Sequence, residues 1–146
     1  MDMMSGLQVS FSALNAQRTR MNVIASNLAN AQSTRTPEGG PYNRKEVILG
    51  AQRQSSPFEV ALQGQLRDGV SEVHVLDIAS DGHSPRLEYE PDHPDANAQG
   101  YVAYPNVSVM HEMVDLLSAS RAYEANVTAI NAAKDMSLRA LQIGRG

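Results

Sequence analysis

Apolar residues recur along the first thirty positions at alternating steps of three and four, the spacing that gathers them on one face of a helix. No proline or glycine interrupts residues 7–36, whereas residues 37–41 contain two prolines and two glycines. We therefore predict an N-terminal helix within residues 1–35 that ends before Pro37. Its apolar seam comprises Met4, Leu7, Phe11, Leu14, Met21, Ala25 and Leu28, with Arg18 as the charged exception.

The last forty residues show the same periodicity. Pro105 and Asn106 are helix-start signals, Gly144 is a stop signal, and no proline or glycine falls between residues 107 and 143. The pattern predicts a second long helix within residues 107–146. Its seam comprises Val109, Met113, Leu116, Ser120, Tyr123, Val127, Ile130 and Leu141.

The period changes to two in the middle of the chain, which is typical of strands with one buried face. The alternating runs are Phe58–Leu62, Val73–Val75 and Leu87–Tyr89, with turn signals at Asp68-Gly69 and Asp81-Gly82 and a loop composition over Pro91–Gly100. The predicted fold class is therefore α+β. Long N- and C-terminal helices pair as a coiled coil, and a small, mainly antiparallel β domain over residues 36–106 is inserted between them.

Both predicted helices carry more apolar surface than one two-helix seam can cover. Met110, Val114 and Leu117 form a second stripe on the C-terminal helix. Val9, Val23 and Ile24 lie off the seam of the N-terminal helix. Such surface has to be buried against something else. The sequence therefore favours a protein with neighbours, although a self-contained coiled coil is the simpler interpretation of the same pattern.

Two asparagines, Asn27 and Asn30, occupy the last turn of the N-terminal seam. A buried asparagine in such a seam fixes the register of an interface, because its amide must find specific hydrogen-bond partners. In the alternative interpretation these side chains face solvent or help to end the helix. Spacing alone does not choose between the two.

Charge and composition exclude several classes of function. The net charge of −4 is concentrated in the middle, because residues 1–35 carry +2, residues 36–106 carry −6 and residues 107–146 carry zero. Nucleic-acid binding needs a basic stripe, and none is present. Cysteine is absent, no apolar run is long enough to span a bilayer, and we expect no cleaved signal peptide.

Few residues suggest chemistry. His83, Asp92, His93 and Asp95 offer metal ligands, but their spacing matches no known metal motif, and polar loops collect such residues freely. No Gly-x-Ser-x-Gly elbow or phosphate-binding glycine loop is present. We therefore expect no enzyme activity, no catalytic residue, no cofactor and no metal. A metal-binding β domain with helical arms is kept as an alternative.

The segment "ALNAQRTRMNVIASNLANAQSTRTPEGGPYNRKEV" resembles the N-terminal motif of the bacterial flagellar rod, hook and hook-associated axial proteins, with Asn27 to Asn30 as the shared core. The segment "SASRAYEANVTAINAAKDM", residues 118–136, is similar to the C-terminal helix of that family. Within the family, the sequences of residues 34–47 and 89–127 resemble the proximal-rod members in particular. The short length of the chain agrees, because the distal-rod and hook members are longer. The resemblance is weakest over residues 50–85.

The resemblance implies a structural subunit of the flagellar basal-body rod, which transmits motor torque and lines the export channel. Its partners would be other proximal and distal rod proteins, the export apparatus and copies of itself in a helical assembly, with no nucleic acid and no membrane insertion. It would be exported without signal cleavage. The residues expected to make assembly contacts are Leu7, Phe11, Leu14, Met21, Asn27, Leu28, Asn30, Met113, Leu116, Leu117, Tyr123, Asn126, Val127, Ile130 and Leu141.

The alternative function is a soluble coiled-coil adaptor whose β domain is a recognition module. An adaptor should have stable helices at low concentration and a finite stoichiometry. A rod subunit should instead associate without a fixed end point, because head-to-tail contacts that do not close produce filaments.

Overall fold

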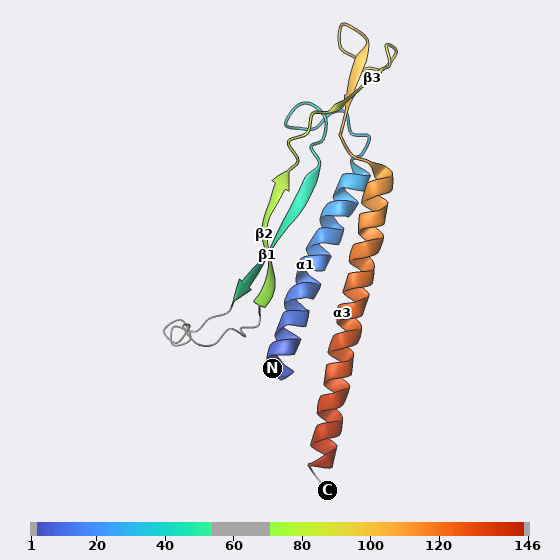
Figure 1. Cartoon of the computed structure of the whole chain (residues 1–146). Helices are drawn as coiled ribbons and strands as arrows, with labels where there is room; N and C mark the ends of the chain where they lie inside the picture. The colour runs from blue at the N-terminus through green and yellow to red at the C-terminus, as the bar shows by residue number, and fades with distance from the viewer. Residues whose placement is uncertain (1–2, 54–70, 145–146) are drawn as a thin grey trace.

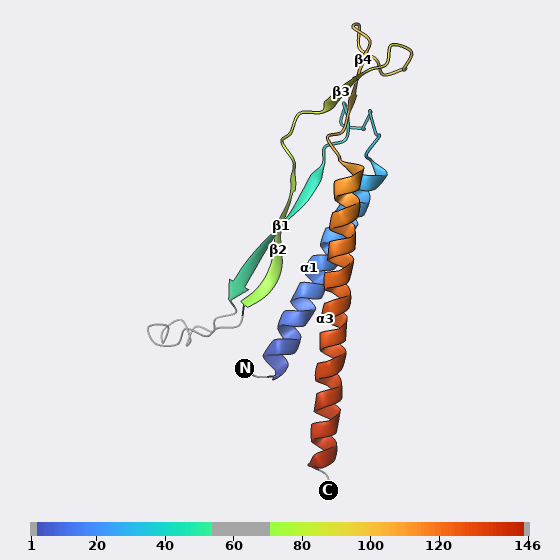
Figure 2. The same ribbon diagram turned by 45° about the vertical axis from the view of Figure 1, so that its right-hand side comes forward.

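The computed structural model describes residues 3–53 and 71–144. Helix α1 (Met3–Ala29) and helix α3 (Val109–Ile143) lie side by side and run antiparallel (Figures 1 and 2). Among the described residues between the two helices there are four strands, namely β1 (Lys45–Arg53), β2 (Ser71–Ser80), β3 (Arg86–Tyr89) and β4 (Tyr101–Tyr104). The predicted α+β class, with paired terminal helices and antiparallel strands between them, is confirmed.

The strands form two separate antiparallel ladders, β1–β2 and β3–β4. The β1–β2 ladder runs along α1, whereas β3–β4 extends past the end of the helix pair where α3 begins (Figure 1). A side-chain bond links the first ladder to α1, because the backbone N–H of Val73 donates to Ser12 Oγ at 3.1 Å. Helix α1 is therefore covered on two sides, by α3 and by the ladder.

This double cover shifts the most buried positions of α1. Ile24 and Asn27 are buried, whereas Ala25 is exposed and Leu28 is half-buried. Ile24 directly precedes the predicted seam residue Ala25, and Asn27 directly precedes Leu28. The buried positions of α1 are therefore rotated from the predicted seam toward the β1–β2 ladder. The expectation that Ile24 adds to leftover apolar surface is wrong, because the prediction did not include a sheet packed on this side of the helix.

Helix α1 ends at Ala29, earlier than the predicted residue 35. The backbone N–H of Asn30 donates to the Ser26 carbonyl at 3.1 Å, and the Asn30 side chain donates to the same oxygen at 2.9 Å. The next backbone N–H, that of Ala31, donates to the Leu28 carbonyl three residues earlier. This tighter turn ends the α-helix. Asparagine side chains compete for backbone partners in this way at helix ends.

The end of α3 agrees with its sequence signals. Gly144 follows the last helical residue, Ile143, and its N–H donates to the Ala140 carbonyl at 3.1 Å. Helix α3 begins at Val109, three residues after Asn106 of the predicted start signal, and Ser108 is its N-cap residue.

The strand predictions are confirmed at two places. Val73–Val75 lies in β2 and Leu87–Tyr89 lies in β3, and the predicted loop over Pro91–Gly100 connects β3 to β4. The turn signal Asp81-Gly82 lies between β2 and β3, which belong to different ladders. The runs at Phe58–Leu62 and Asp68-Gly69 lie outside the described residues.

Strands β1 and β4 were not predicted. In β1 three apolar residues, Val47–Leu49, stand in a row, so the alternation that marks a half-buried strand is missing. A bulge between Ile48 and Leu49 shifts the register there and further breaks the pattern. Strand β4 contains only Tyr101–Tyr104, too few residues to establish a period.

The connector from α1 to β1 folds back on itself. The N–H of Thr36 donates to the Gly40 carbonyl at 2.9 Å, and the Tyr42 N–H donates to the Ser33 carbonyl at 3.0 Å. Gly39 and Gly40 have positive φ angles of 89° and 81°, which residues with a Cβ rarely adopt. This compact loop brings residues 42–45 back beside the last turn of α1.

Candidate assembly site

Asn27 is the centre of a buried polar contact at the end of α1. Its side chain is 1% exposed. The amide nitrogen donates to the Lys45 carbonyl at 2.8 Å and to Glu112 Oε2 at 3.1 Å. The amide oxygen accepts the Lys45 N–H at 2.9 Å and the Tyr42 hydroxyl at 3.0 Å. Both donors and both acceptor positions of the amide are therefore in use.

The contact between Asn27 and Lys45 resembles a strand pairing. One residue of an antiparallel ladder exchanges two bonds with its partner, one through N–H and one through C=O. Here a side-chain amide provides both partners for Lys45, the first residue of β1. Asn27 thus fixes where β1 begins relative to α1.

Glu112 connects the same contact to α3. It is 1% exposed and lies in the first turn of the helix, where a carboxylate is favoured by the helix dipole. Its Oε1 accepts the Nε–H of Arg44 at 2.7 Å, while Oε2 accepts from Asn27. Arg44 in turn reaches Asp81 Oδ2, just after β2, at 3.4 Å.

We call the four residues Asn27, Arg44, Asp81 and Glu112 the polar junction. Partial burial of the Arg44 guanidinium disfavours its charged form, but the hydrogen bond and negative charge of Glu112, helped by Glu46 and Asp81, outweigh that effect and raise the pKa of Arg44 above its ordinary value. The junction connects α1, α3, the start of β1 and the residue after β2.

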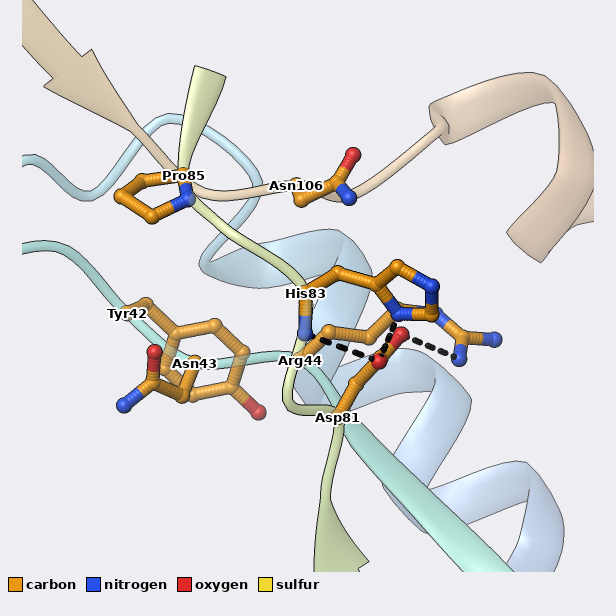
Figure 3. Close-up of a pocket in the computed structure, with 7 residues that line it drawn as sticks. All are labelled: Tyr42, Asn43, Arg44, Asp81, His83, Pro85 and Asn106. Carbon is orange, nitrogen blue, oxygen red and sulfur yellow. Dashed lines mark hydrogen bonds and ion pairs between the residues drawn. The ribbon is translucent and has the colours of Figure 1, made fainter. Parts of the chain in front are cut away.

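Figure 3 shows the outer end of the polar junction. Asp81 accepts hydrogen bonds from the backbone N–H of His83 and from Arg44, and its carboxylate lies against the His83 ring. The hydrogen bond from the His83 side chain is the main cause that lowers the pKa of Asp81 below its usual value of 3.8. Burial of the carboxylate opposes this shift but does not cancel it.

Replacing Asp81 by asparagine should therefore have a pH-dependent effect. A carboxylate with a lowered pKa stabilises the fold above its usual pKa, and this contribution is lost as the pH falls through the folded-state value. We expect Asp81→Asn to lower stability at pH 7 and the difference from the unaltered chain to shrink below pH ~4. Urea unfolding at pH 7 and pH 3 measures the difference in unfolding free energy between the variant and the unaltered chain. The same difference at both pH values would contradict the prediction.

The predicted assembly residues lie in three environments. Asn27 is buried inside the chain. Those that are half-buried, mostly along the helix pair, are Leu7, Leu14, Met21, Leu28, Asn30, Leu116, Tyr123, Asn126, Val127 and Ile130. Those that are exposed are Phe11, Met113, Leu117 and Leu141. Their contacts with other subunits stay a prediction.

The second apolar stripe predicted on α3 is exposed. Met110, Met113, Val114 and Leu117 share one side of the first turns of this helix, and Met110 and Leu117 are 75% and 61% exposed. We call these four residues the α3 patch. One turn further along the helix Arg121 and Glu124 interrupt the apolar character. The patch is therefore a bounded apolar surface without a covering element among the residues that the structure describes.

The residues considered for chemistry do not converge. Within residues 3–53 and 71–144, no three histidine and carboxylate side chains gather as a metal site would require. Instead His83 lies against Asp81, and His93 Nδ1 accepts the backbone N–H of Asp95 at 3.1 Å. Asp95 also accepts the Thr34 hydroxyl at 2.8 Å, which ties the connector to the β3–β4 loop.

Neither of the described helices has a stretch both long and apolar enough to cross a membrane.

Sequence reasoning identified Asn27 but missed Arg44 and Glu112. The spacing that places Glu112 on the seam side of α3 was visible, since it lies four positions before Leu116. Its partner was not visible, because Arg44 lies 68 residues away, in a connector whose path depends on the loop at residues 36–40. Only the fold brings the two charges together.

Comparison with known proteins gives consistent matches over the entire chain. Residues 7–35 match the family described as flagella basal body rod protein, and residues 98–143 match the C-terminal family of flagellar basal body rod FlgEFG proteins. The chain is similar to the flagellar basal-body rod protein FlgC of Bacillus subtilis, at 48% identity over 95% of this chain and 96% of that protein. It is 42% identical to FlgC of Borreliella burgdorferi over the full length of both, and 42% identical to FlgC of Salmonella typhimurium over 99% and 100%.

Proposed function

This chain belongs to the FlgC family of flagellar basal-body rod proteins, and we propose that it joins the rod through the apolar surface that α3 leaves exposed. Its function is that of a structural subunit of the bacterial flagellar basal-body rod. The family assignment favours this function over the soluble adaptor. The proposal adds which surface of α3 contacts other rod subunits and how the fold transmits force between the β1–β2 ladder and the helix pair.

The α3 patch is the observation that carries the proposal. Exposing four apolar side chains to water is unfavourable in the free chain, because fully burying one large apolar side chain stabilises by about 1.5–3 kcal/mol. Two of the four are methionines, whose flexible side chains adapt to different packing partners. A subunit that meets non-identical neighbours needs a surface of this kind.

The polar junction would give the subunit its rigidity. It links both helices to the β1–β2 ladder through hydrogen bonds and ion pairs between buried or half-buried groups. Force applied to the ladder is then passed to the helix pair without a flexible hinge between them. In this proposal the terminal helices, within residues 1–35 and 107–146, form the inner layer that lines the export channel, and residues 36–106 contribute the outer part.

The proposed partners are other proteins of the proximal and distal rod, the export apparatus at the base and further copies of this chain. A non-enzymatic role is part of the proposal and is supported by the similarity to structural rod proteins. No cofactor is part of the proposal.

A single charge in the α3 patch tests the proposal. Leu117→Asp should abolish or strongly reduce swimming in a host in which this chain is the sole rod protein of its family, because a carboxylate buried in an apolar contact is strongly unfavourable. Soft-agar motility and the amount of chain in isolated basal bodies are the measurements. Since Leu117 is exposed, circular dichroism of the purified variant should remain unchanged.

Thr128→Asp is the matched control. Thr128 is exposed on the same side of α3, three turns beyond the patch, and has no large apolar neighbours there. We expect this variant to swim. Normal motility of Leu117→Asp would contradict the proposed surface, whereas equal loss in both variants would show that the whole side of the helix is sensitive to charge and that the patch is not special.

A further inference from the structure

Asp81 is followed directly by Gly82, and this dipeptide can rearrange without an enzyme. The backbone nitrogen after an aspartate can attack the side-chain Cγ, and glycine hinders that attack least because it has no Cβ. A C–N bond closes a five-membered succinimide ring, while the hydroxyl of the carboxylic acid and the amide proton leave together as water. Water then opens the ring at either carbonyl. The product is aspartate again or isoaspartate, in which the main chain runs through Cγ.

The glycine half of this pair is unrestrained in the fold. Gly82 is exposed, and among the described residues no hydrogen bond holds its N–H. Its φ angle is not positive, and a Cβ built on it would meet no atom within 4 Å. The fold therefore does not require glycine at this position. Any restraint on the reaction has to come from the Asp81 side chain.

The Asp81 carboxylate is held by two neighbours (Figure 3). Arg44 Nη1 donates to Oδ2 at 3.4 Å, the backbone N–H of His83 donates to Oδ1 at 3.2 Å, and the His83 ring lies against Oδ1. The side chain of Asp81 is only 15% exposed. A carboxylate held in this way is not free to turn and present Cγ to the Gly82 nitrogen.

The charge of the carboxylate restrains the reaction a second time. Ring closure proceeds from the neutral carboxylic acid, because an ionised carboxylate offers no hydroxyl to leave as water. The hydrogen bond from the His83 side chain lowers the pKa of Asp81, so less of the neutral acid is present at pH 7 than in an unfolded chain. The same contacts that orient the side chain therefore also keep it unreactive.

We propose that Asp81-Gly82 is a site of spontaneous isoaspartate formation that the polar junction and His83 suppress while the chain is folded. The site becomes reactive whenever the end of β2 separates from Arg44. Neither the site nor its protection depends on assembly of the chain.

Isoaspartate at this position would break the outer end of the polar junction. The main chain would gain one atom before Gly82, and the carboxylate would be attached directly to Cα, one carbon shorter than before. In the folded chain the Asp81 N–H donates to the Arg44 carbonyl at 2.7 Å while the carboxylate reaches the Arg44 guanidinium. The shortened carboxylate would no longer reach that guanidinium from the same backbone position. Isomerisation would thus detach the residue after β2 from Arg44.

Isoaspartate formation in the purified chain tests the proposal. The chain would be kept at pH 7 for several weeks with and without urea, and isoaspartate would be located by peptide mass spectrometry. Asp68-Gly69, the other such pair in the sequence, provides the reference rate for the unfolded chain in urea. We expect Asp81 to react at the reference rate in urea. In the folded chain it should react at least ~tenfold more slowly, because charged hydrogen bonds have to break first.

Two variants identify the site and the source of its protection. Gly82→Ala should keep the fold and nearly abolish isoaspartate at Asp81 in urea, since the added methyl group hinders the attacking nitrogen. His83→Ala removes a side chain that is 73% exposed, so the fold should persist in circular dichroism. Its rate at Asp81, divided by its own rate in urea, should rise several-fold in the folded chain.

Three results would overturn the proposal. Isoaspartate that forms at Asp68 but not at Asp81 in urea would show that the pair is not a reactive site. Equal rates at Asp81 in the folded and the unfolded chain would show that the fold gives no protection. Unchanged protection in the folded His83→Ala variant would show that the contacts of the carboxylate are not its source.

Discussion

Replacing Asn27 by leucine should lower the free energy of unfolding by roughly 3–4 kcal/mol. The change removes all the hydrogen bonds of the amide and leaves the Lys45 backbone, the Tyr42 hydroxyl and Glu112 short of partners. Each buried group left unsatisfied costs ~1–3 kcal/mol, and such costs are not fully additive. Urea unfolding of the purified chain, followed by circular dichroism, gives the difference.

Asn22→Leu is the matched control for this change. Asn22 lies on the exposed side of the same helix, so the same substitution there should alter stability by less than about 0.5 kcal/mol. Equal unfolding midpoints of the Asn27→Leu variant and the unaltered chain would show that the polar junction does not hold α1 to β1.

Replacing Glu112 by methionine should lower the free energy of unfolding by roughly 3 kcal/mol. Removing one partner of a buried ion pair typically costs ~3–5 kcal/mol, because the other charge stays behind. We expect the lower end of that range because Arg44 keeps its contact with Asp81 and is partly exposed.

The double variant Arg44→Met with Glu112→Met separates the pair from its surroundings. If the two charges act on each other, the double variant should be more stable than the sum of the two single losses predicts, by ~1.5 kcal/mol or more. Full additivity of the two losses would mean that each residue is held by other contacts. The same unfolding measurement applies to all three variants.

The sequence was most informative where periodicity is long. Repeats at steps of three and four over about thirty residues identified both helices, and the leftover stripe of Met110, Val114 and Leu117 was predicted from spacing alone. Gly144 correctly marked the end of α3. These features depend on local sequence, which is why they could be predicted.

The missed features depend on contacts between distant segments. The end of α1 at Ala29 follows from a side-chain bond of Asn30 that the helical pattern does not reveal. Strand β1 was missed because its apolar run and its bulge hide the alternation. The ladder that it forms then explains why Ile24 is buried, against expectation.

The polar junction explains why the asparagine in the last turn of α1 is more than a helix-end residue. A leucine would suit a helix seam better, but it could not pair with both backbone groups of Lys45 or reach the Glu112 carboxylate. Asn30, one turn later, bonds to the Ser26 carbonyl and to Ser33, and so shapes the exit from the helix. The two asparagines therefore act differently inside this chain.

The central claim, that the rod buries the exposed side of α3, is tested most directly by methionine oxidation. The free chain and isolated basal bodies would be exposed to the same dose of hydrogen peroxide, and oxidation at Met110 and Met113 would be measured by mass spectrometry. Both side chains are exposed in the free chain, so both should oxidise readily there. The account predicts that Met110 is oxidised much less in basal bodies than in the free chain, because a side chain buried in a contact loses its access to the oxidant. Equal oxidation of Met110 in the two samples would contradict it.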